Sequence, residues 1–395
     1  MAKIEVENLY KVFGPRSQID EALQMAKDGG ERGEIQDKTG CTVAVRDVTF
    51  TVEGAEIFVI MGLSGSGKST LLRCVNRLME PTDGQVHVDE EDILALDHDP
   101  LLKIREKKMA MVFQHFGLLS HKTVLENAAF GLELANVSKS QREEKGREAL
   151  EMVGLEKYGD SMVGELSGGM QQRVGLARAL ATDAEILLMD EAFSALDPLI
   201  RADMQDEFLE LQKQIPKTIL FITHDLSEAL KLGDRIAIMK DGAIIQIGAP
   251  EEIVLNPEDD YVAAFVENVD RTRVLTVSTA SAETQPAVES GASAREALEV
   301  MKKTEIPFAF VLEDGRPERV IPRWEAEKAA ESDGNDLSDL GRSAPEPVDG
   351  DDHLIAVLER AAEADAPLPI VDDDGRLKAV VTQGMLLRAI AGGAE

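Results

Sequence analysis

Apolar and polar residues alternate in two segments near the start of the chain, IEVENLYKVF (4–13) and TVAVRDVTFTV (42–52). This period of two is typical of half-buried β-strands, because successive side chains of a strand point to opposite faces of the sheet. Residues 14–38, which lie between the two segments, are strongly charged and rich in helix-forming residues. We therefore expect two strands separated by a helical insert.

Three further segments are almost continuously apolar: EIFVIMG (56–62), ILLMDE (186–191) and TILFITHD (218–225). Such runs are typical of parallel strands that are buried on both faces. Helical patterns follow at residues 69–79 and 204–214, and residues 115–180 have a mostly helical pattern. Strands that alternate with helices predict an α/β fold built on a parallel sheet.

After about residue 270 the pattern changes to shorter elements, which repeat at an offset of 60 residues. The tripeptide Asp-Gly-Arg marks the match, at 314–316 and again at 374–376. Each copy is predicted to contain a helix, a strand, a turn at Asp-Gly and a second strand. We therefore divide the chain into a domain of residues 1–270 and a small pseudo-symmetric domain of residues 271–395.

The charge of the chain is unusually negative, with 74 acidic against 42 basic residues and a net charge of −32. Residues 1–270 carry −21 of this charge and residues 271–395 carry −11, so the charge is a property of the whole surface and not of a tail. A polyanionic surface repels phosphates, which argues against a nucleic-acid partner. It also suggests adaptation to high salt, where screening removes the self-repulsion.

A glycine-rich loop joins the apolar strand at residues 56–62 to a predicted helix. Its residues are Gly62, Leu63, Ser64, Gly65, Ser66, Gly67, Lys68 and Ser69, followed by Thr70. They fit the phosphate-binding pattern G-x-x-x-x-G-K-[ST] in the strand–loop–helix context that this pattern requires. Backbone N–H groups at a helix N-terminus attract the phosphates, Lys68 would meet the β- and γ-phosphates, and the Ser69 hydroxyl would bind Mg²⁺. A merely flexible turn does not explain Lys and Ser at these positions, so ATP and Mg²⁺ are the predicted ligands.

A second half of the site is predicted at the end of ILLMDE, where Asp190 and Glu191 are adjacent. Asp190 would hold the Mg²⁺, and Glu191 would polarise the water that attacks the γ-phosphate. An acidic pair alone is common at helix caps. The phosphate loop upstream makes the catalytic interpretation the stronger one.

The segment LSGGMQQR (166–173) resembles the signature of ATP-binding cassette (ABC) ATPases, and it lies between the two nucleotide motifs as in that family. The resemblance implies a RecA-like core, an antiparallel β subdomain and a helical subdomain. It also implies a head-to-tail homodimer, in which Ser167, Gly168 and Gly169 of one chain contact the ATP held by the other. Ser-Gly-Gly before a helix is independently suited to receive an anion.

The remaining motifs of the family follow in order. Gln114 in MVFQ matches the glutamine that touches Mg²⁺ and the attacking water, and His224 in ITHD matches the histidine that contacts the γ-phosphate. The segment SALD (194–197), which ends in Asp197, matches the loop that crosses the dimer interface. Phe13 aligns with the aromatic residue that stacks on adenine, although Tyr10 is close enough in the sequence to compete.

The insert at 14–38, the motif sequences and the appended repeat together are similar to ATPase subunits of glycine betaine/proline importers. Those subunits work at the cytoplasmic face of the membrane with a permease and a substrate-binding protein, and take up compatible solutes under osmotic stress. The repeat resembles a tandem CBS pair, which is either a sensor or a stabilising or dimerising appendage. In CBS repeats that bind nucleotides, a Thr is commonly followed three residues later by an Asp. Here the second repeat has Thr382 and Met385, and the first has Pro322 and Glu325.

Other functions remain to be weighed against a compatible-solute importer. An importer subunit for another small solute, such as an amino acid, would not be expected to carry the insert and the repeat. Cassette ATPases of DNA repair or translation have long coiled-coil arms, zinc ligands or two cassettes in one chain, and this sequence contains none of these. The chain also has no run of 18 apolar residues, so we expect any membrane role to depend on a partner.

Overall fold

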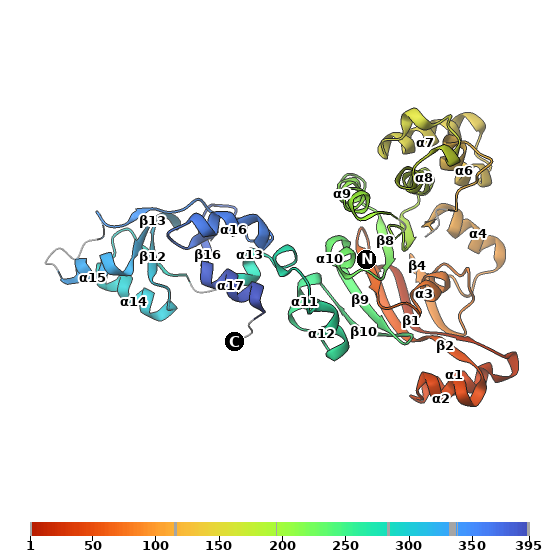
Figure 1. Ribbon diagram of the computed structural model, residues 1–395, viewed down its shortest axis with the longest axis horizontal. Coiled ribbons are helices and arrows are strands. Elements are labelled where there is room, and N and C mark those ends of the chain that lie inside the picture. Colours follow the sequence, from red (N-terminus) through yellow and green to blue (C-terminus); the bar gives the residue numbers. More distant parts are fainter. Residues whose placement is uncertain are drawn as a thin grey trace. The chain divides into compact units, whose positions relative to one another are not determined.

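The computed structural model describes residues 2–113, 117–194, 196–282, 285–331, 337 and 339–392 (Figure 1). The chain forms two compact units, Met1–Glu267 and Asn268–Glu395. The first unit combines a mostly parallel sheet, an antiparallel sheet and a group of helices, so the predicted α/β class is confirmed. No helix among the described residues is long and apolar enough to cross a membrane.

A six-stranded sheet forms the centre of the first unit. Its strands, in spatial order, are β10 (Ala243–Gly248), β9 (Arg235–Lys240), β3 (Ile57–Met61), β8 (Thr218–Thr223), β7 (Ile186–Asp190) and β6 (Met109–Val112). All neighbours are parallel except β10, which pairs antiparallel with β9. Every residue of β3, β7 and β8 is buried, as the continuous apolar runs predicted.

The helices of this part of the unit lie between these strands in the sequence or follow the last of them, β10. They are α3 (Lys68–Val75), α4 (His98–Lys107), α9 (Pro198–Gln214), α10 (Leu226–Leu232), α11 (Pro250–Leu255) and α12 (Asp260–Val266). The helix predicted at 69–79 ends early, at Val75. Arg77 adopts a left-handed conformation (φ 54°), and its guanidinium donates to the carbonyl oxygens of Ile93 and Leu96. The left-handed backbone of Arg77 ends the helical path, and the two side-chain hydrogen bonds hold this conformation.

An antiparallel sheet packs beside the central one. Its strands are β2 (Thr42–Glu53), β1 (Ala2–Phe13), β4 (Asp83–Val88) and β5 (Glu91–Asp92), in that order. Their inward residues, such as Ile4, Val48 and Phe50, belong to the same buried core as Phe58 and Ile60 of β3. The two alternating segments of the sequence therefore pair with each other, as β1 with β2.

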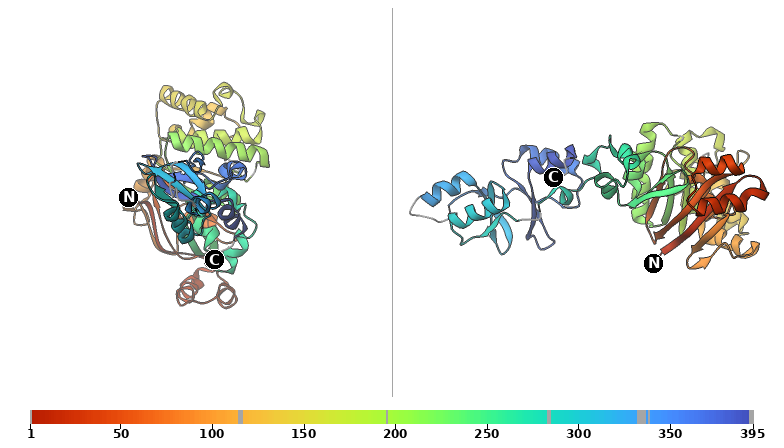
Figure 2. Two further views of the ribbon diagram at one scale, coloured as in Figure 1. Left: turned by 90° about the vertical axis from the view of Figure 1, so that its left-hand side faces the viewer. Right: turned by 90° about the horizontal axis from the view of Figure 1, so that it is seen from below.

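The charged insert between β1 and β2 folds as two helices, α1 (Ile19–Lys27) and α2 (Arg32–Thr39), preceded by the 3₁₀ turn η1 (Arg16–Gln18). Both helices lie beside β1 and β2 (Figure 2). They have a small apolar core of their own, made of Ala22, Ala26 and Ile35 packed on Tyr10, Val12, Cys41 and Val43. The insert is therefore an ordered part of the first unit.

Residues 117–180 are mostly helical, as predicted. The elements are α5 (Val124–Ala128), α6 (Phe130–Leu134), α7 (Lys139–Met152), η2 (Glu156–Tyr158), η3 (Val163–Glu165) and α8 (Gly168–Leu180). The helices α5, α7 and α8 contact one another, and α8 also contacts β6. This group is the helical subdomain that the sequence predicted.

The second unit contains the two predicted repeats. Its elements are η4 (Arg271–Arg273), α13 (Val277–Ala280), β11 (Ala287–Glu289), α14 (Ala294–Thr304), β12 (Phe308–Glu313), β13 (Arg316–Pro322), α15 (Arg323–Glu331), β14 (Arg342–Ser343), α16 (Leu354–Glu363), β15 (Leu368–Val371), β16 (Leu377–Val381) and α17 (Gln383–Ala391). Each copy has a helix and an antiparallel strand pair joined at Asp-Gly, as predicted. The two turns meet, because Nε of Arg316 donates to the carbonyl oxygen of Asp374 at 3.1 Å.

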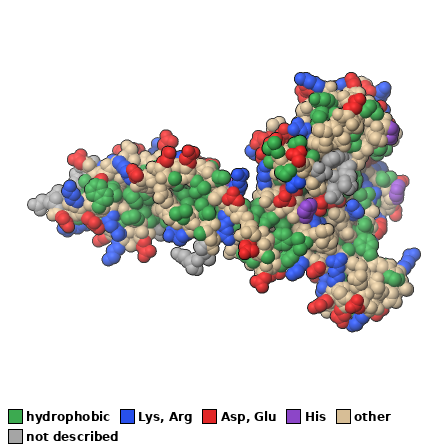
Figure 3. All heavy atoms as spheres, viewed as in Figure 1, with side chains coloured by type: hydrophobic (Ala, Val, Ile, Leu, Met, Phe, Trp, Pro, Cys, Tyr) green, Lys and Arg blue, Asp and Glu red, His purple; other side chains and the backbone are tan. Residues whose placement is uncertain are grey.

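Acidic side chains are spread over the visible faces of both units, with Lys and Arg between them (Figure 3). This distribution agrees with the similar charge density expected for the two parts of the chain. Many basic residues are paired with carboxylates, among them Lys145 with Asp183 and Arg173 with Glu207. The excess of carboxylates leaves the surface strongly negative overall.

Candidate functional site

Three neighbouring parallel strands bring the predicted site residues to one edge of the central sheet. In the strand register, Met61 of β3 pairs with Thr223 of β8, and Asp190 of β7 pairs with Ile222 of β8. The loops that follow β3, β7 and β8 therefore leave the sheet side by side. Carboxyl ends of parallel strands are the usual position for ligand sites in α/β sheets.

The phosphate loop, residues 62–69, needs glycine at two positions for steric reasons. Gly62 (φ 150°) and Gly67 (φ 107°) both lie in the region that favours glycine. A Cβ atom on Gly62 would collide with the carbonyl oxygen of Met239, and one on Gly67 with that of Ala44. The loop therefore packs closely against β9 and β2, and only glycine fits at these two positions.

Lys68 begins α3 and is almost completely buried, with 5% of its surface exposed. Its Nζ atom donates to the carbonyl oxygens of Gly62 at 2.8 Å and Leu63 at 3.1 Å. Burial lowers the pKa of Lys68, while the nearby carboxylates of Glu191 and Asp190 act in the opposite direction. The ammonium group lies inside the loop, where a phosphate would be bound.

The loop also contains a buried hydroxyl group without a partner in the described part of the chain. Oγ of Ser66 is buried, and no described protein atom forms a hydrogen bond with it. An unsatisfied buried polar atom is costly, and one inside a phosphate loop can be satisfied by a ligand oxygen. Together with the buried Lys68, this atom shows that the loop fits an anionic ligand.

A hydrogen bond joins the phosphate loop to β7, since the hydroxyl of Ser69 donates to Oδ1 of Asp190 at 2.9 Å. Asp190 is 4% exposed, and its Oδ2 lies 3.6 Å from Nη2 of Arg73. A hydroxyl and a carboxylate oxygen at this distance fit Mg²⁺, which usually binds one or two protein ligands and keeps waters and substrate phosphates for the rest. Among the described residues, no group of three or more His, Cys, Asp or Glu side chains is placed to hold a metal ion.

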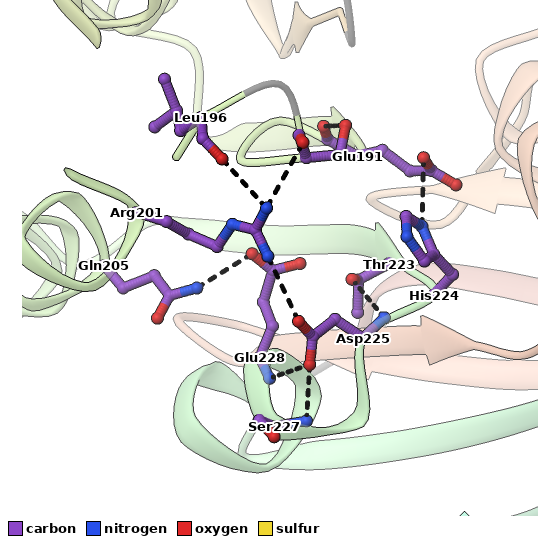
Figure 4. A network of polar contacts seen from close by, with 10 residues as sticks. Glu191, Leu196, Arg201, Gln205, Thr223, His224, Asp225, Ser227 and Glu228 are labelled. Atoms are coloured by element: carbon purple, nitrogen blue, oxygen red, sulfur yellow. Dashed lines mark hydrogen bonds and ion pairs between the residues drawn. The ribbon is translucent and has the colours of Figure 1, made fainter. Parts of the chain in front are cut away.

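Glu191 and His224 face each other from the ends of β7 and β8 (Figure 4). Nδ1 of His224 lies 3.3 Å from Oε2 of Glu191. Glu191 has a left-handed backbone (φ 47°), and its N–H donates to the carbonyl oxygen of Ile222 at 3.0 Å. This hydrogen bond attaches the backbone of Glu191 to β8 and so limits the positions that the Glu191 carboxylate can reach.

Arg201 of α9 connects the loop after β7 to the loop after β8 (Figure 4). Its Nη2 donates to the carbonyl oxygens of Leu196 at 3.0 Å and Ser194 at 3.4 Å. Its Nη1 donates to Oδ2 of Asp225, the residue after His224, at 3.4 Å. The network continues through Gln205, which donates to Oε1 of buried Glu228 at 3.0 Å.

Two predicted dimer-contact motifs lie at helix N-termini. Ser167 caps α8 through a hydrogen bond from the N–H of Met170, and both Ser167 and Gly168 are exposed, whereas Gly169 is buried. Asp197 caps α9 by accepting from the N–H of Ile200 at 3.2 Å. The exposed Ser167–Gly168 segment is accessible to a second molecule.

The two candidates for stacking on adenine have different surroundings. Tyr10 is 6% exposed and packs in the core of the insert. Phe13 is 40% exposed, with Nζ of Lys11 5.0 Å from its ring centre. The accessible ring is therefore that of Phe13.

Gln114 lies outside the described residues. Leu63 and Ser64 of the phosphate loop are exposed, and Thr70, in the first turn of α3, is partly buried.

Sequence reasoning did not identify Arg201 or Arg73. Arg201 follows Asp197 by one helical turn, so the register of the capped helix could have directed attention to it. Arg73 has an equivalent relation to Ser69 in α3. The sequence offers no comparable signal for Arg32 of the insert, which donates to the carbonyl oxygen of Gly65.

In the second unit, neither repeat presents the Thr and Asp pair of nucleotide-binding CBS repeats. Thr382 caps α17 by accepting from the N–H of Met385, and the Met385 side chain packs on an apolar cluster. In the first repeat, Oε2 of Glu325 accepts from the N–H of Gly341 at 2.7 Å.

Comparison with protein families agrees with this geometry. The ABC transporter family matches residues 45–194, and the CBS domain family matches residues 337–392. The first range contains the phosphate loop, the signature segment and the Asp190–Glu191 pair. The second range contains the second of the two repeats.

Several curated proteins are similar over most of the chain. The glycine betaine transport ATP-binding protein OpuAA of Bacillus subtilis is 48% identical, and the match covers 100% of this chain and 93% of that protein. The glycine betaine/proline betaine transport system ATP-binding protein ProV of Escherichia coli is 45% identical, over 98% of this chain and 97% of that protein. The trimethylamine N-oxide transport system ATP-binding protein TmoW of Pelagibacter ubique is 50% identical, over 70% and 80% respectively.

Solved structures support the fold of the first unit. A dimeric post-hydrolysis state of the ATP-binding cassette MJ0796 bound to ADP and Pi has a TM-score of 0.52 and 32% identity, and covers 62% of this chain and 98% of that chain. CbiO1 of Clostridium perfringens, part of an ABC transporter complex, has a TM-score of 0.54 and 25% identity, over 65% and 92%. The phosphate loop, the acidic pair at the end of β7 and the full-length relatives lead to one conclusion: the chain belongs to the ABC transporter family and is one of its ATP-binding ATPases, with CBS repeats at its C-terminal end.

Proposed function

We propose that this chain is the ATPase subunit of an importer for glycine betaine, proline betaine and related compatible solutes. The observation that carries the proposal is the arrangement of Lys68, Ser69, Asp190, Glu191 and His224 at one edge of the sheet, in a chain whose full-length relatives are glycine betaine transport ATP-binding proteins. The similarity to these relatives extends through the C-terminal repeats, which favours a subunit of this type of importer over other cassette ATPases.

Each site residue has a role that its position supports. The N–H groups of the phosphate loop and the ammonium of Lys68 bind the β- and γ-phosphates of ATP. Ser69 and Asp190 are the protein ligands for Mg²⁺, with Gln114 as the further predicted ligand, and the ion supplies charge neutralisation on the phosphates. Phe13 stacks on the adenine.

Hydrolysis needs a base and a group that holds the terminal phosphate. Glu191 orients and polarises the attacking water through its carboxylate. His224, whose ring contacts that carboxylate, holds Glu191 in place and donates toward the γ-phosphate. Lys68 and His224 then both stabilise the negative charge that develops on the phosphate oxygens.

The functional state is a homodimer of this chain. Ser167, Gly168 and Gly169 of one protomer meet the ATP bound by its partner, and the loop ending at Asp197 crosses the interface. The exposure of Ser167 and Gly168 at the N-terminus of α8 supports this arrangement, because the helix dipole favours an anion there. The hydrogen bonds from Arg201 to the carbonyl oxygens of Ser194 and Leu196 hold this loop in place.

A membrane permease binds in a groove between the central sheet and the helical subdomain. The groove has a volume of about 630 Å³ and is lined largely by apolar residues, among them Met109, Phe113, Phe130 and Leu134. Leu134 is 66% exposed, which is unusual for a leucine unless a partner covers it. A short amphipathic helix of a permease loop suits this groove. The ATPase would then act at the cytoplasmic face of the membrane, with a substrate-binding protein completing the importer.

The C-terminal repeats, residues 271–395, regulate the ATPase. The acidic surface of this segment makes ionic strength a candidate signal, because screening changes its repulsion from other charged surfaces over roughly 8 to 10 Å at physiological salt. Neither repeat offers a ribose-binding Asp at the expected position, which favours a signal other than adenosine. A purely stabilising role is the alternative.

The test is ATPase activity of the complex reconstituted with its permease and substrate-binding protein. Glycine betaine and proline betaine are expected to stimulate hydrolysis, and proline, choline, trimethylamine N-oxide and glutamine serve as comparisons. Stimulation by glutamine alone would favour an amino-acid importer. Stimulation by trimethylamine N-oxide alone would assign the chain to a different branch of solute importers.

A further inference from the structure

Arg32, a residue of the insert between β1 and β2, forms a hydrogen bond with the phosphate loop. Arg32 is the first residue of α2, and its Nη1 donates to the carbonyl oxygen of Gly65 at 3.3 Å. The same nitrogen lies 3.8 Å from Oδ1 of Asp241, in the turn between β9 and β10. Arg32 thus bridges two segments of the first unit that are far apart in the sequence.

The insert that carries Arg32 is anchored without its help. Ile35 of α2 and Ala22 and Ala26 of α1 are buried against β1 and β2. Lys27, at the end of α1, forms an ion pair with Asp83 of β4. The side chain of Arg32 is 30% exposed and contributes nothing to this small core. Replacement of Arg32 is therefore expected to leave the insert folded.

The carbonyl that Arg32 binds belongs to a turn of the phosphate loop. The N–H of Ser66 donates to the carbonyl oxygen of Leu63 at 3.2 Å, and Gly65 has a positive φ of 83° within this turn. The C=O and N–H of one peptide unit are coplanar and point in opposite directions. A donor on the Gly65 carbonyl therefore also fixes the N–H of Ser66 that closes the turn.

The carbonyl oxygen of the next peptide unit also accepts a hydrogen bond, from the turn that contains Asp241. The N–H of Gly242 donates to the carbonyl oxygen of Ser66 at 2.9 Å, which directs the N–H of Gly67 away from Gly242. Arg32 and the turn at Asp241–Gly242 thus each donate a hydrogen bond to one of two successive carbonyl oxygens of the loop. A loop that is already in its binding conformation loses less entropy when a ligand binds.

We propose that Arg32 is a positioning residue of the ATP site, and that the insert is part of the nucleotide-binding machinery. Arg32 holds the turn of residues 63–66 in the conformation that receives the phosphates and adds a permanent positive charge beside the loop. The proposal rests on the ATP-binding role of residues 62–69. Its ligand class is nucleoside di- and triphosphates, since both reach the loop.

The test compares nucleotide affinity of full-length variants by titration with the fluorescent analogues mant-ATP and mant-ADP. For Arg32→Gln we expect an increase in both dissociation constants of roughly threefold to tenfold, the effect of losing one charge-assisted bond at a partly exposed site. Arg32→Lys, which keeps the charge and can donate one bond, is expected to fall between Arg32→Gln and the unaltered chain. The kcat of the complex at saturating ATP is expected to change little, so that KM rises while kcat stays.

A matched control lies on the same helix. Lys38 forms an exposed pair with Glu34 at 2.7 Å, so Lys38→Gln removes the same charge from α2 without touching the loop. Hydrogen exchange of residues 62–69 without nucleotide gives a second reading, and it is expected to be faster in Arg32→Gln than in Lys38→Gln. This comparison stands even if thermal stability falls slightly.

The outcomes are distinguishable from a failure of the ATPase assignment itself. An unaltered chain that binds no mant-ATP, or one whose binding survives Lys68→Ala, would contradict ATP binding by this loop. Normal binding by the unaltered chain together with equal affinities of Arg32→Gln and Lys38→Gln would overturn the role of Arg32 alone. A fall in kcat without a rise in KM would overturn it as well.

Discussion

Nδ1 of His224 lies 3.3 Å from Oε2 of Glu191, although the two residues follow different strands, β8 and β7, and are separated by a helix in the sequence. The contact exists because β7 and β8 are parallel neighbours whose carboxyl ends coincide. It places an imidazole against the carboxylate that we assign as the base. The first two predictions follow from this pair.

Glu191→Gln is expected to keep ATP affinity and to lower the hydrolysis rate by roughly 10²- to 10⁴-fold, the usual contribution of a general base. Glutamine has nearly the same shape as glutamate and can remain in contact with His224, but it cannot accept a proton from water. Phosphate release and mant-ATP titration measure the two quantities. ATP-dependent dimers should accumulate in size-exclusion chromatography. Unchanged phosphate release would remove Glu191 from the mechanism.

His224→Ala is expected to reduce hydrolysis by about 10²-fold, because one donor to the transition-state phosphate is lost and Glu191 loses its contact. ATP affinity should change less, since the phosphate loop and Lys68 remain. His98→Ala is the matched control, because His98 is exposed at the beginning of α4 and far from these motifs in the sequence. Equal rates for the two variants would show that the position of His224 is only structural.

Arg201→Ala should affect dimer formation more than nucleotide binding. Arg201 donates to the carbonyls of Ser194 and Leu196, so its loss frees the loop that is predicted to cross the interface. We expect mant-ATP affinity of the protomer within about twofold of normal and turnover lower by roughly tenfold, since hydrogen bonds to charged groups contribute about 1.5–3 kcal/mol each. Lys213→Ala, on an exposed part of α9, is the control. A loss of ATP affinity equal to the loss of turnover would contradict this assignment.

The sequence motifs predicted that the candidate site residues lie where the strands of the parallel sheet end, because strand, loop and helix are local and their residues are contiguous. The sequence could not show that Tyr10 is buried while Phe13 is exposed, since this difference depends on how α1 packs over β1. It also could not show the bridges made by Arg32 and Arg201. Both join segments brought together only by the tertiary fold, and a single arginine among many charged residues has no local pattern.

Removal of residues 268–395 should leave basal ATPase activity in the complex and flatten its dependence on salt concentration. The first unit is compact by itself, and its site residues all precede Glu267. The full-length complex is expected to show stimulation of hydrolysis as salt rises, because screening changes the interactions of the acidic C-terminal unit. An identical salt profile for the truncated complex would indicate that the repeats only stabilise the protein.

Glu228 gives a prediction about pH that is independent of catalysis. It is 4% exposed at the start of α10, and burial raises its pKa above 4.5, against the lowering effect of hydrogen bonds from Thr223 and Gln205. The unfolded chain therefore loses the proton of Glu228 at a lower pH than the folded chain. The stabilisation by protonated Glu228 is complete below the unfolded pKa, near 4.5, and is lost as the pH rises through the folded pKa. Glu228→Gln removes this titration while keeping an acceptor for Gln205.

The melting temperature of Glu228→Gln should thus exceed that of the unaltered chain at pH 7 and approach or fall below it near pH 4. Loss of any carboxylate from so acidic a chain relieves some repulsion, so Glu148→Gln, on the exposed side of α7, measures that general effect. The informative quantity is the difference between the two variants as a function of pH. A difference that does not grow from pH 4 to pH 7 would mean that burial of Glu228 imposes no cost on its ionised form.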